Sequence, residues 1–229
     1  QGTYGYPDFH GTRDFYSLLK QVTREFNEHY NRYNEVKYNI IKDALCRNFG
    51  GLQDSINGIL SIFEKNMNIK FDTNNLPVID LIKNNLSDRD SRFLLLFTNG
   101  ESASYILDNY LKMEHRVFMI GSEFENDKDK DEHSFRLLSD IILYMESGSS
   151  IIMKNLDQIY GSLYDLFNQN FMIVGQKKNC RIALGSTNNP MCFVNNNFHC
   201  VVLVDLKDLD RMDPPFLNRF EKQILTFDS

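Results

Sequence analysis

The sequence contains no tryptophan, five prolines and four cysteines among its 229 residues. The cysteines are Cys46, Cys180, Cys192 and Cys200, and no two of them form a CxxC pair. Disulfides persist in oxidising compartments, and these scattered cysteines instead indicate a reducing one. A cytoplasmic location is therefore the expectation.

The sequence also lacks a long apolar run and an excess of positive charge. No stretch approaches the roughly 20 apolar residues needed to span a bilayer, and no signal peptide opens the chain. The net charge of −6 disfavours a general nucleic-acid surface, because neutralising phosphates requires a basic face. Since the sequence starts at Gln1 rather than at methionine and ends directly after a helix-like pattern, we expect a segment of a longer protein.

Nucleotide-hydrolysis motifs are missing where an α/β ATPase carries them. A phosphate loop ends in Lys-Ser/Thr, but residues 98–104 contain one glycine, no lysine and the acidic Glu101. An ATPase also carries paired acids at the end of a neighbouring strand, where residues 154–156 read Lys-Asn-Leu. Asp157 comes too late and is predicted to cap the next helix. We therefore expect no hydrolysis by this segment itself.

What the sequence does contain is a change from helical to alternating patterns. Residues 13–65 carry apolar side chains at helical spacing and predict a small helical unit. A polar, asparagine-rich passage between residues 66 and 85 marks a boundary. From residue 92 on, apolar runs alternate with helical patterns, which predicts a parallel sheet covered on both faces. The expected strands are 93–97, 116–120, 150–153 and 200–204, with a hairpin of 180–184 and 191–194, and the expected helices are 103–112, 135–146 and 158–170.

The last candidate motif is a proline-led segment that carries Arg219. Proline suits the first helical turn, so residues 213–215 predict the start of a helix with Phe216 and Phe220 on its apolar side. Arg219 would lie near the start of this helix. A guanidinium held beside a nucleotide-binding sheet is what phosphoryl-transfer machines use as an arginine finger. The alternative is a surface arginine paired with Glu221 or an aspartate.

Arg47 is a second candidate and lies in the last turn of a predicted helix, before Gly50 and Gly51. In one interpretation the arginine interacts favourably with the carboxyl end of its own helix. In the other it senses a nucleotide bound by a domain that precedes this chain. The residues alone favour the first interpretation.

Two further patterns imitate metal sites. Residues 127–131 resemble the start of a calcium loop, but its sixth and twelfth positions are Glu132 and Leu138 instead of glycine and glutamate. We expect a solvated loop. Cys192 and the pair 199–200 suggest zinc, yet adjacent strand residues point to opposite faces. Core cysteines are the better interpretation, and no metal site is expected.

Four segments in chain order carry a resemblance to one family: GTRDFYSLLK at 11–20, RNFGG at 47–51, NLDQIYGSLYDLFNQ at 155–169 and PPFLNRFEK at 214–222. Together they resemble the motor core of the mysterin-type giant RING-finger E3 ubiquitin ligases, which contain a dynein-like AAA+ array. The matches extend over nearly the whole chain, and no single one is a generic nucleotide motif.

The resemblance implies a P-loop-NTPase-like (AAA+) α/β fold, a parallel sheet flanked by helices, preceded by an all-α lid subdomain. Residues 1–66 would be the helical lid of a preceding AAA+ unit, 67–91 a linker, and 92–229 a degenerate AAA+ core lacking its own lid. Arg47 would be a second sensor for the upstream ATP. Arg219 would be a finger reaching the same ATP and its Mg²⁺ in the neighbouring unit, or would survive as a structural remnant. Degeneracy also agrees with Asp205, because the AAA+ pattern has a polar sensor residue after that strand and an aspartate there would bring negative charge towards the phosphate.

The resemblance further implies that the parent protein hydrolyses ATP and transfers ubiquitin. Adjacent AAA+ units would be the partners of this segment, while ubiquitin-conjugating enzyme, ubiquitin and zinc would be bound by regions outside it. We expect no cofactor bound by this segment alone, no nucleic acid and no transmembrane segment. The alternative is a catalytically inert structural or interaction pseudo-AAA+ module. A stand-alone doubly wound enzyme has less support, because no dinucleotide fingerprint is visible.

Overall fold

The computed structural model describes residues 8–28, 33–72, 76–100, 105–107, 115–121, 131–185 and 187–226. The chain has an α/β fold with a five-stranded parallel sheet flanked by helices, as the sequence predicted. It divides into two compact units, one formed by residues 1–105 and 205–229 and the other by 106–204. Two of the parallel strands belong to the first unit and three to the second.

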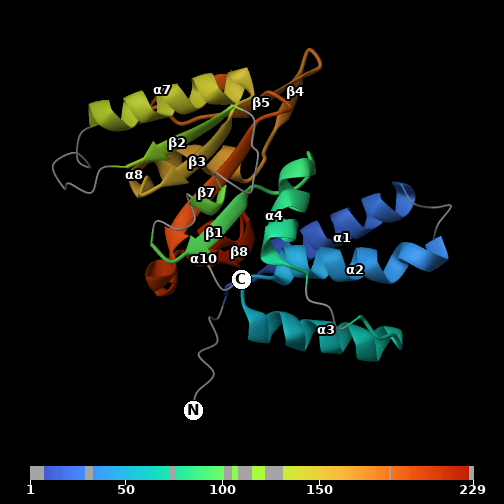
Figure 1. Ribbon diagram of the computed structural model, residues 1–229. Helices are drawn as coiled ribbons and strands as arrows, with labels where there is room; N and C mark the ends of the chain where they lie inside the picture. Colours follow the sequence, from blue (N-terminus) through green and yellow to red (C-terminus); the bar gives the residue numbers. More distant parts are fainter. Residues whose placement is uncertain are drawn as a thin grey trace. The chain divides into compact units, whose positions relative to one another are not determined.

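The first unit begins with helices α1 (Thr12–Glu28), α2 (Tyr33–Phe49) and α3 (Gln53–Met67). Figure 1 shows α2 between α1 and α3, and the helices bury a shared apolar cluster that includes Leu18, Leu45 and Ile56. The cluster explains the helical spacing of apolar residues in this part of the sequence. The helical structure predicted for residues 13–65 is confirmed.

Helix α4 (Val78–Ser87) lies inside the segment 67–91, which we expected to be a linker. Its inward face buries Leu81, Ile82 and Asn85. The division into 1–66, 67–91 and 92–229 stays a prediction, but its middle part contains a packed helix.

Strands β1 (Leu94–Thr98) and β8 (Glu221–Leu225) pair in parallel in the first unit, with Leu94 opposite Glu221. All five residues of β1 are buried, as expected for an apolar run covered on both faces. Strand β8 corrects the sequence analysis, which had expected a helix there. The helix that begins at Pro214, α10 (Pro214–Leu217), ends after four residues, because the backbone from residue 221 pairs with β1 instead.

The start of α10 agrees with its sequence. Asp213 caps it, since one of its carboxylate oxygens accepts a hydrogen bond from the Phe216 amide at 3.2 Å. Pro214 and Pro215 occupy the first helical positions, where the missing N–H groups have no helical partner to lose. A short 3₁₀ helix, η3 (Leu206–Arg211), precedes this cap.

The second unit contains the parallel strands β2 (Arg116–Ile120), β3 (Ser150–Lys154) and β7 (His199–Asp205), in the order β2-β3-β7. Helix α7 (Asp131–Ser147) packs against β3. These elements confirm the predicted strands and the predicted helix at 135–146. The calcium-like sequence at 127–131 lies mostly outside the described residues, and from Asp131 on it is helical, so the expected solvated loop does not extend into α7.

The predicted helix at 158–170 is shorter and is interrupted. It comprises α8 (Asp157–Tyr160), η2 (Gly161–Leu163) and α9 (Tyr164–Phe167). The predicted capping role of Asp157 is wrong, because Leu156 occupies the cap position and Asp157 is the first helical residue. The fully buried Leu156 explains this register, since packing fixes where the helix starts.

A small antiparallel sheet completes the second unit, with strands β4 (Met172–Val174), β5 (Lys177–Arg181) and β6 (Met191–Phe193) in that order. The hairpin of β5 and β6 was predicted, although β5 begins three residues earlier than expected. Cys180 and Cys192 face each other across it, and both are buried, as is Cys200 on β7. The prediction of core cysteines is therefore confirmed.

Parts of two other predictions fall outside the described residues. Of the phosphate-loop position 98–104, the structure describes residues 98–100. Of the predicted helix at 103–112, it describes 105–107, which are helical. Among the described helices, none is long and apolar enough to cross a membrane.

Candidate functional site

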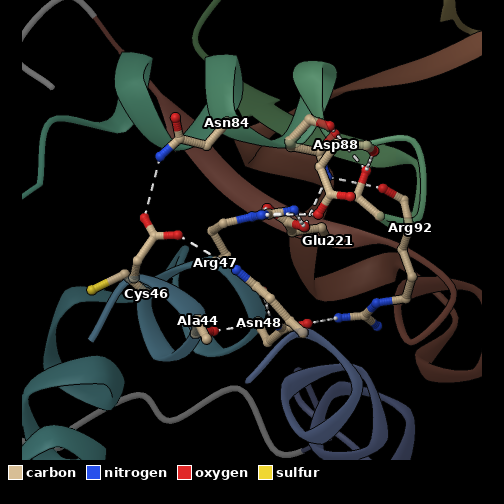
Figure 2. Close-up of polar contacts among 12 residues, drawn as sticks. Ala44, Cys46, Arg47, Asn48, Asn84, Asp88, Arg92 and Glu221 are labelled. Atoms are coloured by element: carbon tan, nitrogen blue, oxygen red, sulfur yellow. Dashed lines mark hydrogen bonds and ion pairs between the residues drawn. The ribbon is translucent and has the colours of Figure 1, made fainter. Parts of the chain in front are cut away.

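Arg47 lies in the last turn of α2, where only 3% of its surface is exposed. Its guanidinium binds Glu221 through two parallel hydrogen bonds, from Nε to Oε1 at 3.0 Å and from Nη2 to Oε2 at 3.1 Å. The third nitrogen, Nη1, donates to Asp88 at 3.2 Å. Figure 2 shows Arg47 with its contacts to Glu221 and Asp88. Fork-to-fork pairing of this kind is the strongest arginine–carboxylate geometry.

Glu221 is the first residue of β8 and is 2% exposed. In addition to Arg47, its Oε2 accepts a hydrogen bond of 2.7 Å from the side-chain amide of Asn85 on α4. Burial raises the pKa of Glu221, while the charge of Arg47 and its hydrogen bonds act in the opposite direction. The carboxylate is thus held by one residue from α2 and one from α4.

Lys222, the next residue of β8, forms a second buried ion pair. Its Nζ lies 2.9 Å from Asp14 Oδ1 and 5.4 Å from the centre of the Phe9 ring. Arg92 contacts the same carboxylate oxygen at 2.8 Å. Burial lowers the pKa of Lys222 to about 8, against the attraction of Asp14. Asp14, which lies on α1, therefore binds two cationic side chains, Lys222 and Arg92.

Asn85 joins the two ion pairs, because its side-chain amide donates to Glu221 and, at 2.9 Å, to the carbonyl of Arg92. Further neutral side chains add hydrogen bonds around them. Asn48 on α2 donates to Gln21 at 2.9 Å and accepts from Arg92 at 3.1 Å. Gln223, the third residue of β8, donates to the Cys46 carbonyl at 3.1 Å. We call this set the buried polar cluster; its members are Asp14, Gln21, Arg47, Asn48, Asn85, Asp88, Arg92, Glu221, Lys222 and Gln223.

The buried polar cluster binds three helices to one strand. Each ionic side chain in it has a partner of opposite charge, and the buried positions are paired as buried charges must be. Such an arrangement fixes the positions of α1, α2 and α4 on β8, because each buried charge depends on a partner from another element.

Beside Arg47 lies a surface depression of about 690 Å³. Its lining includes Arg24, Arg89 and Asp43, and it is richer in carboxylates than in arginines; the acidic members are Glu25, Glu28, Asp43, Asp88 and Asp90. Burial raises the pKa values of Glu25 and Asp43. Excess negative charge disfavours a bound phosphate, so this depression does not suit a nucleotide.

Arg219, the other predicted site residue, follows α10 and is half-buried. Its Nη1 donates to the carbonyl of Pro215, one helical turn earlier. The predicted alternative partner, Glu221, is bound by Arg47 and Asn85. The structure thus gives the two candidate arginines separate partners: Arg47 joins the buried polar cluster, and Arg219 is oriented by its own short helix.

The strand ends, where an AAA+ core carries its acidic and polar catalytic groups, have structural uses here. Asp205, at the end of β7, accepts a hydrogen bond of 3.1 Å from the Lys207 amide and caps η3. Its other oxygen lies 3.2 Å from the Lys207 ammonium. At the end of β3, Lys154 accepts a backbone hydrogen bond of 2.8 Å from Gly121 through its carbonyl. Neither strand end presents an acidic pair.

Sequence reasoning missed most of the buried polar cluster. The signal lay in Glu221, Lys222 and Gln223, three polar residues in a row between Phe220 and Ile224. On an exposed helix they are ordinary, and only a strand assignment would make them buried and in need of partners.

Comparison with known proteins gives a consistent result. A family model described as "RNF213 AAA domain" matches residues 83–229. The chain is 29% identical over 231 residues to the E3 ubiquitin-protein ligase RNF213 of Mus musculus and 29% identical over 233 residues to that of Homo sapiens. It is also 29% identical over 224 residues to the E3 ubiquitin-protein ligase rnf213-beta of Danio rerio. These alignments cover 95%, 95% and 93% of this chain but 4% of each relative, so the chain spans a small part of their length.

Proposed function

The chain belongs to the RNF213 AAA domain family, and from this premise we propose that it is a structural module in the AAA+ motor of a longer E3 ubiquitin ligase. In this role it holds a helical lid against the strand that follows it and has no nucleotide site of its own. The resemblance of the sequence to mysterin-type ligases is confirmed by the family match. The finer roles below rest on the geometry of the first unit.

The observation that carries the proposal is the buried pair of Arg47 and Glu221. A sensor arginine has to reach a phosphate, and Arg47 would have to leave Glu221 to do so. Leaving one charge of a buried pair without its partner costs about 3–5 kcal/mol. The pairing therefore supports a structural role for Arg47 over the sensor role that the family resemblance implies.

The same pair supports a mechanical role for the segment. Arg47 comes from α2, in the predicted lid of a preceding unit, and Glu221 from β8, in the predicted following core. Their bidentate contact and the Asp14–Lys222 pair hold α1 and α2 on β8. A movement of the lid, driven by ATP in the preceding unit, would then be passed directly to β8.

A double substitution in the full-length ligase tests this function. Arg47→Met with Glu221→Leu replaces both charges by apolar groups, a change that is often neutral for folding. If the pair is structural, ATP turnover and melting temperature stay near those of the wild type. A large loss of turnover at an unchanged melting temperature would instead show that the charges act in turnover, and turnover retained in Glu221→Gln, which leaves Arg47 in place, would then assign Arg47 to a nucleotide.

A second candidate function concerns Arg219 as an arginine finger for ATP and Mg²⁺ held by a neighbouring unit. It is favoured by the bond from Arg219 to the Pro215 carbonyl, which sets the direction of the guanidinium locally. If Arg219 is a finger, Arg219→Ala lowers ATP turnover of the full-length protein by about 10³- to 10⁵-fold. Arg211→Ala is the matched control, since the Arg211 side chain is 85% exposed and lies one element earlier. Unchanged ATP turnover in Arg219→Ala would exclude the arginine-finger role, and the structural module would then be the one proposed function that stands.

The activities of the parent protein are part of the same proposal. The relatives are named as E3 ubiquitin-protein ligases. For this chain's parent we propose ATP hydrolysis by other AAA+ units in the cytoplasm and ubiquitin transfer through a RING region. That region would hold zinc and contact the ubiquitin-conjugating enzyme, and it lies outside this chain.

A further inference from the structure

The β4 strand of the second unit exposes three apolar side chains in a row. Met172 is 56% exposed, Ile173 70% and Val174 57%. β4 is the terminal strand of the small antiparallel sheet, and β5 is its one neighbour among the described strands. Its outer edge therefore offers unpaired backbone N–H and C=O groups beside exposed apolar side chains, a combination that proteins ordinarily avoid.

The register of the sheet shows how these side chains are arranged. Met172 lies opposite Asn179, and Val174 opposite Lys177, so Met172 and Val174 share one face. The same face carries the half-exposed Met191, opposite Arg181 on β5. Ile173 points to the other face. Apolar groups thus surround the edge of β4 on both sides instead of forming one flat patch.

The hairpin is also the basic part of an acidic protein. Residues 171–193 contain Lys177, Lys178 and Arg181 and no aspartate or glutamate, whereas the whole chain has a net charge of −6. Arg181 is paired with Asp165 at 2.8 Å. The two lysines instead lie over aromatic rings, Lys177 over Phe193 at 5.5 Å and Lys178 over Phe171 at 4.9 Å.

We propose that the free edge of β4 binds an extended acidic segment of a partner protein, which adds a fourth strand to this sheet. Backbone hydrogen bonds supply part of the affinity in such strand addition, and side chains supply the selection. Apolar residues of the segment contact Met172 and Val174, and its carboxylates lie on the opposite face of the sheet, beside Ile173 and near Lys178. A second copy of this chain fits poorly, because two basic hairpins would repel each other. A lipid bilayer fits poorly, because the apolar groups do not lie in one plane.

The test uses the 229-residue chain and a fluorescein-labelled heptapeptide of alternating glutamate and valine, followed by fluorescence anisotropy at low salt. We expect saturable binding that Lys177→Glu with Lys178→Glu weakens at least tenfold, as loss of close charge pairs predicts. The matched control is Lys65→Glu with Lys70→Glu, two exposed lysines in the other unit, which leaves the affinity unchanged. A peptide with lysine for glutamate, or with N-methyl groups on alternate residues, should bind at least tenfold more weakly.

Several outcomes would overturn the proposal. Equal binding of the glutamate and N-methylated peptides would show that charge alone attracts them and that no strand is added. Absence of saturable binding would show that the edge of β4 does not bind such a segment. Concentration-dependent dimerisation, or binding to vesicles of anionic lipid in place of the peptide, each abolished by Lys177→Glu with Lys178→Glu, would assign the hairpin to a second copy or to a membrane.

Discussion

Strands β8 and β7 are both buried, but by opposite means. In β8 the exposed fractions of Glu221, Lys222 and Gln223 are 2%, 1% and 2%, while Val201 and Val202 of β7 are 0% exposed. Apolar burial is non-directional, so β7 needs neighbours of the right volume and little else. β8 instead needs a specific partner for each side chain, from α1, α2 and α4.

This difference explains why the helical segment is attached where it is. Sliding α2 along β8 by one turn would separate Arg47 from Glu221 and bury two unpaired charges. A polar strand therefore permits one arrangement of the helices, even though the ion pairs add little net stability. In the first unit the charges select the geometry, and in the second unit the apolar strands supply the bulk of burial.

The largest effect is expected from Glu221→Ala. It leaves Arg47 buried without its bidentate partner, and the free energy of unfolding should fall by about 3–5 kcal/mol. Urea denaturation monitored by circular dichroism measures this change. A loss below about 1 kcal/mol would mean that the pair is effectively solvated and that β8 resembles a surface strand.

The double variant Arg47→Met with Glu221→Leu sharpens the same comparison. If the polar strand serves specificity more than stability, most of the loss in Glu221→Ala should be recovered, because apolar replacement of a whole buried pair is often neutral or stabilising. A double variant as unstable as Glu221→Ala would show that the pair itself stabilises the fold.

A smaller effect follows from the pKa of Lys222, which burial lowers from 10.5 to about 8. Between these pH values the unfolded chain holds a proton that the folded chain has released, so the free energy of unfolding should rise with pH in this window. The contribution is about 3 kcal/mol for a shift of this size. Denaturation at several pH values between about 7 and about 10.5 measures it.

Lys222→Met is the control for this pH dependence. It removes the lysine contribution but keeps the buried thiols, whose raised pKa values, about 11 for Cys46 and about 12 for Cys180, act in the opposite direction. The difference between the wild type and the variant therefore isolates Lys222. Parallel pH curves for the two proteins would show that Lys222 stays protonated in the fold.

The fold could be predicted from the sequence wherever a strand or helix was apolar in its own right. The short apolar runs in β1, β3 and β7 predicted their strands, because runs of this length are typical of strands buried on both faces and are too short for most helices. The strand β8 could not be recognised, since Glu221 and Lys222 have the polarity of an exposed helix. Its burial depends on partners more than 170 positions away along the chain, at Arg47 and Asp14.

The candidate site, like the fold, could be predicted only in part from the sequence. Arg47 was selected for its place at the end of a helix, but its partner Glu221 was weighed as a partner of Arg219. Local spacing favours a pairing between residues 219 and 221, whereas the fold brings a residue from α2 to Glu221 instead. Sequence separation hides long-range ion pairs because a side chain's sequence neighbours say nothing about which distant carboxylate it meets.

The smallest effect is expected from Ile152→Val in β3, where Ile152 is 1% exposed. Removing one buried methylene should lower the free energy of unfolding by about 0.5–1.5 kcal/mol. The loss should be the same at every pH between 6 and 10, because the substitution changes no group that binds a proton. A loss as large as that of Glu221→Ala would mean that the apolar strands are as selective as β8. The polar strand β8 and the apolar strands would then differ in composition but not in how strictly they fix the positions of their neighbours.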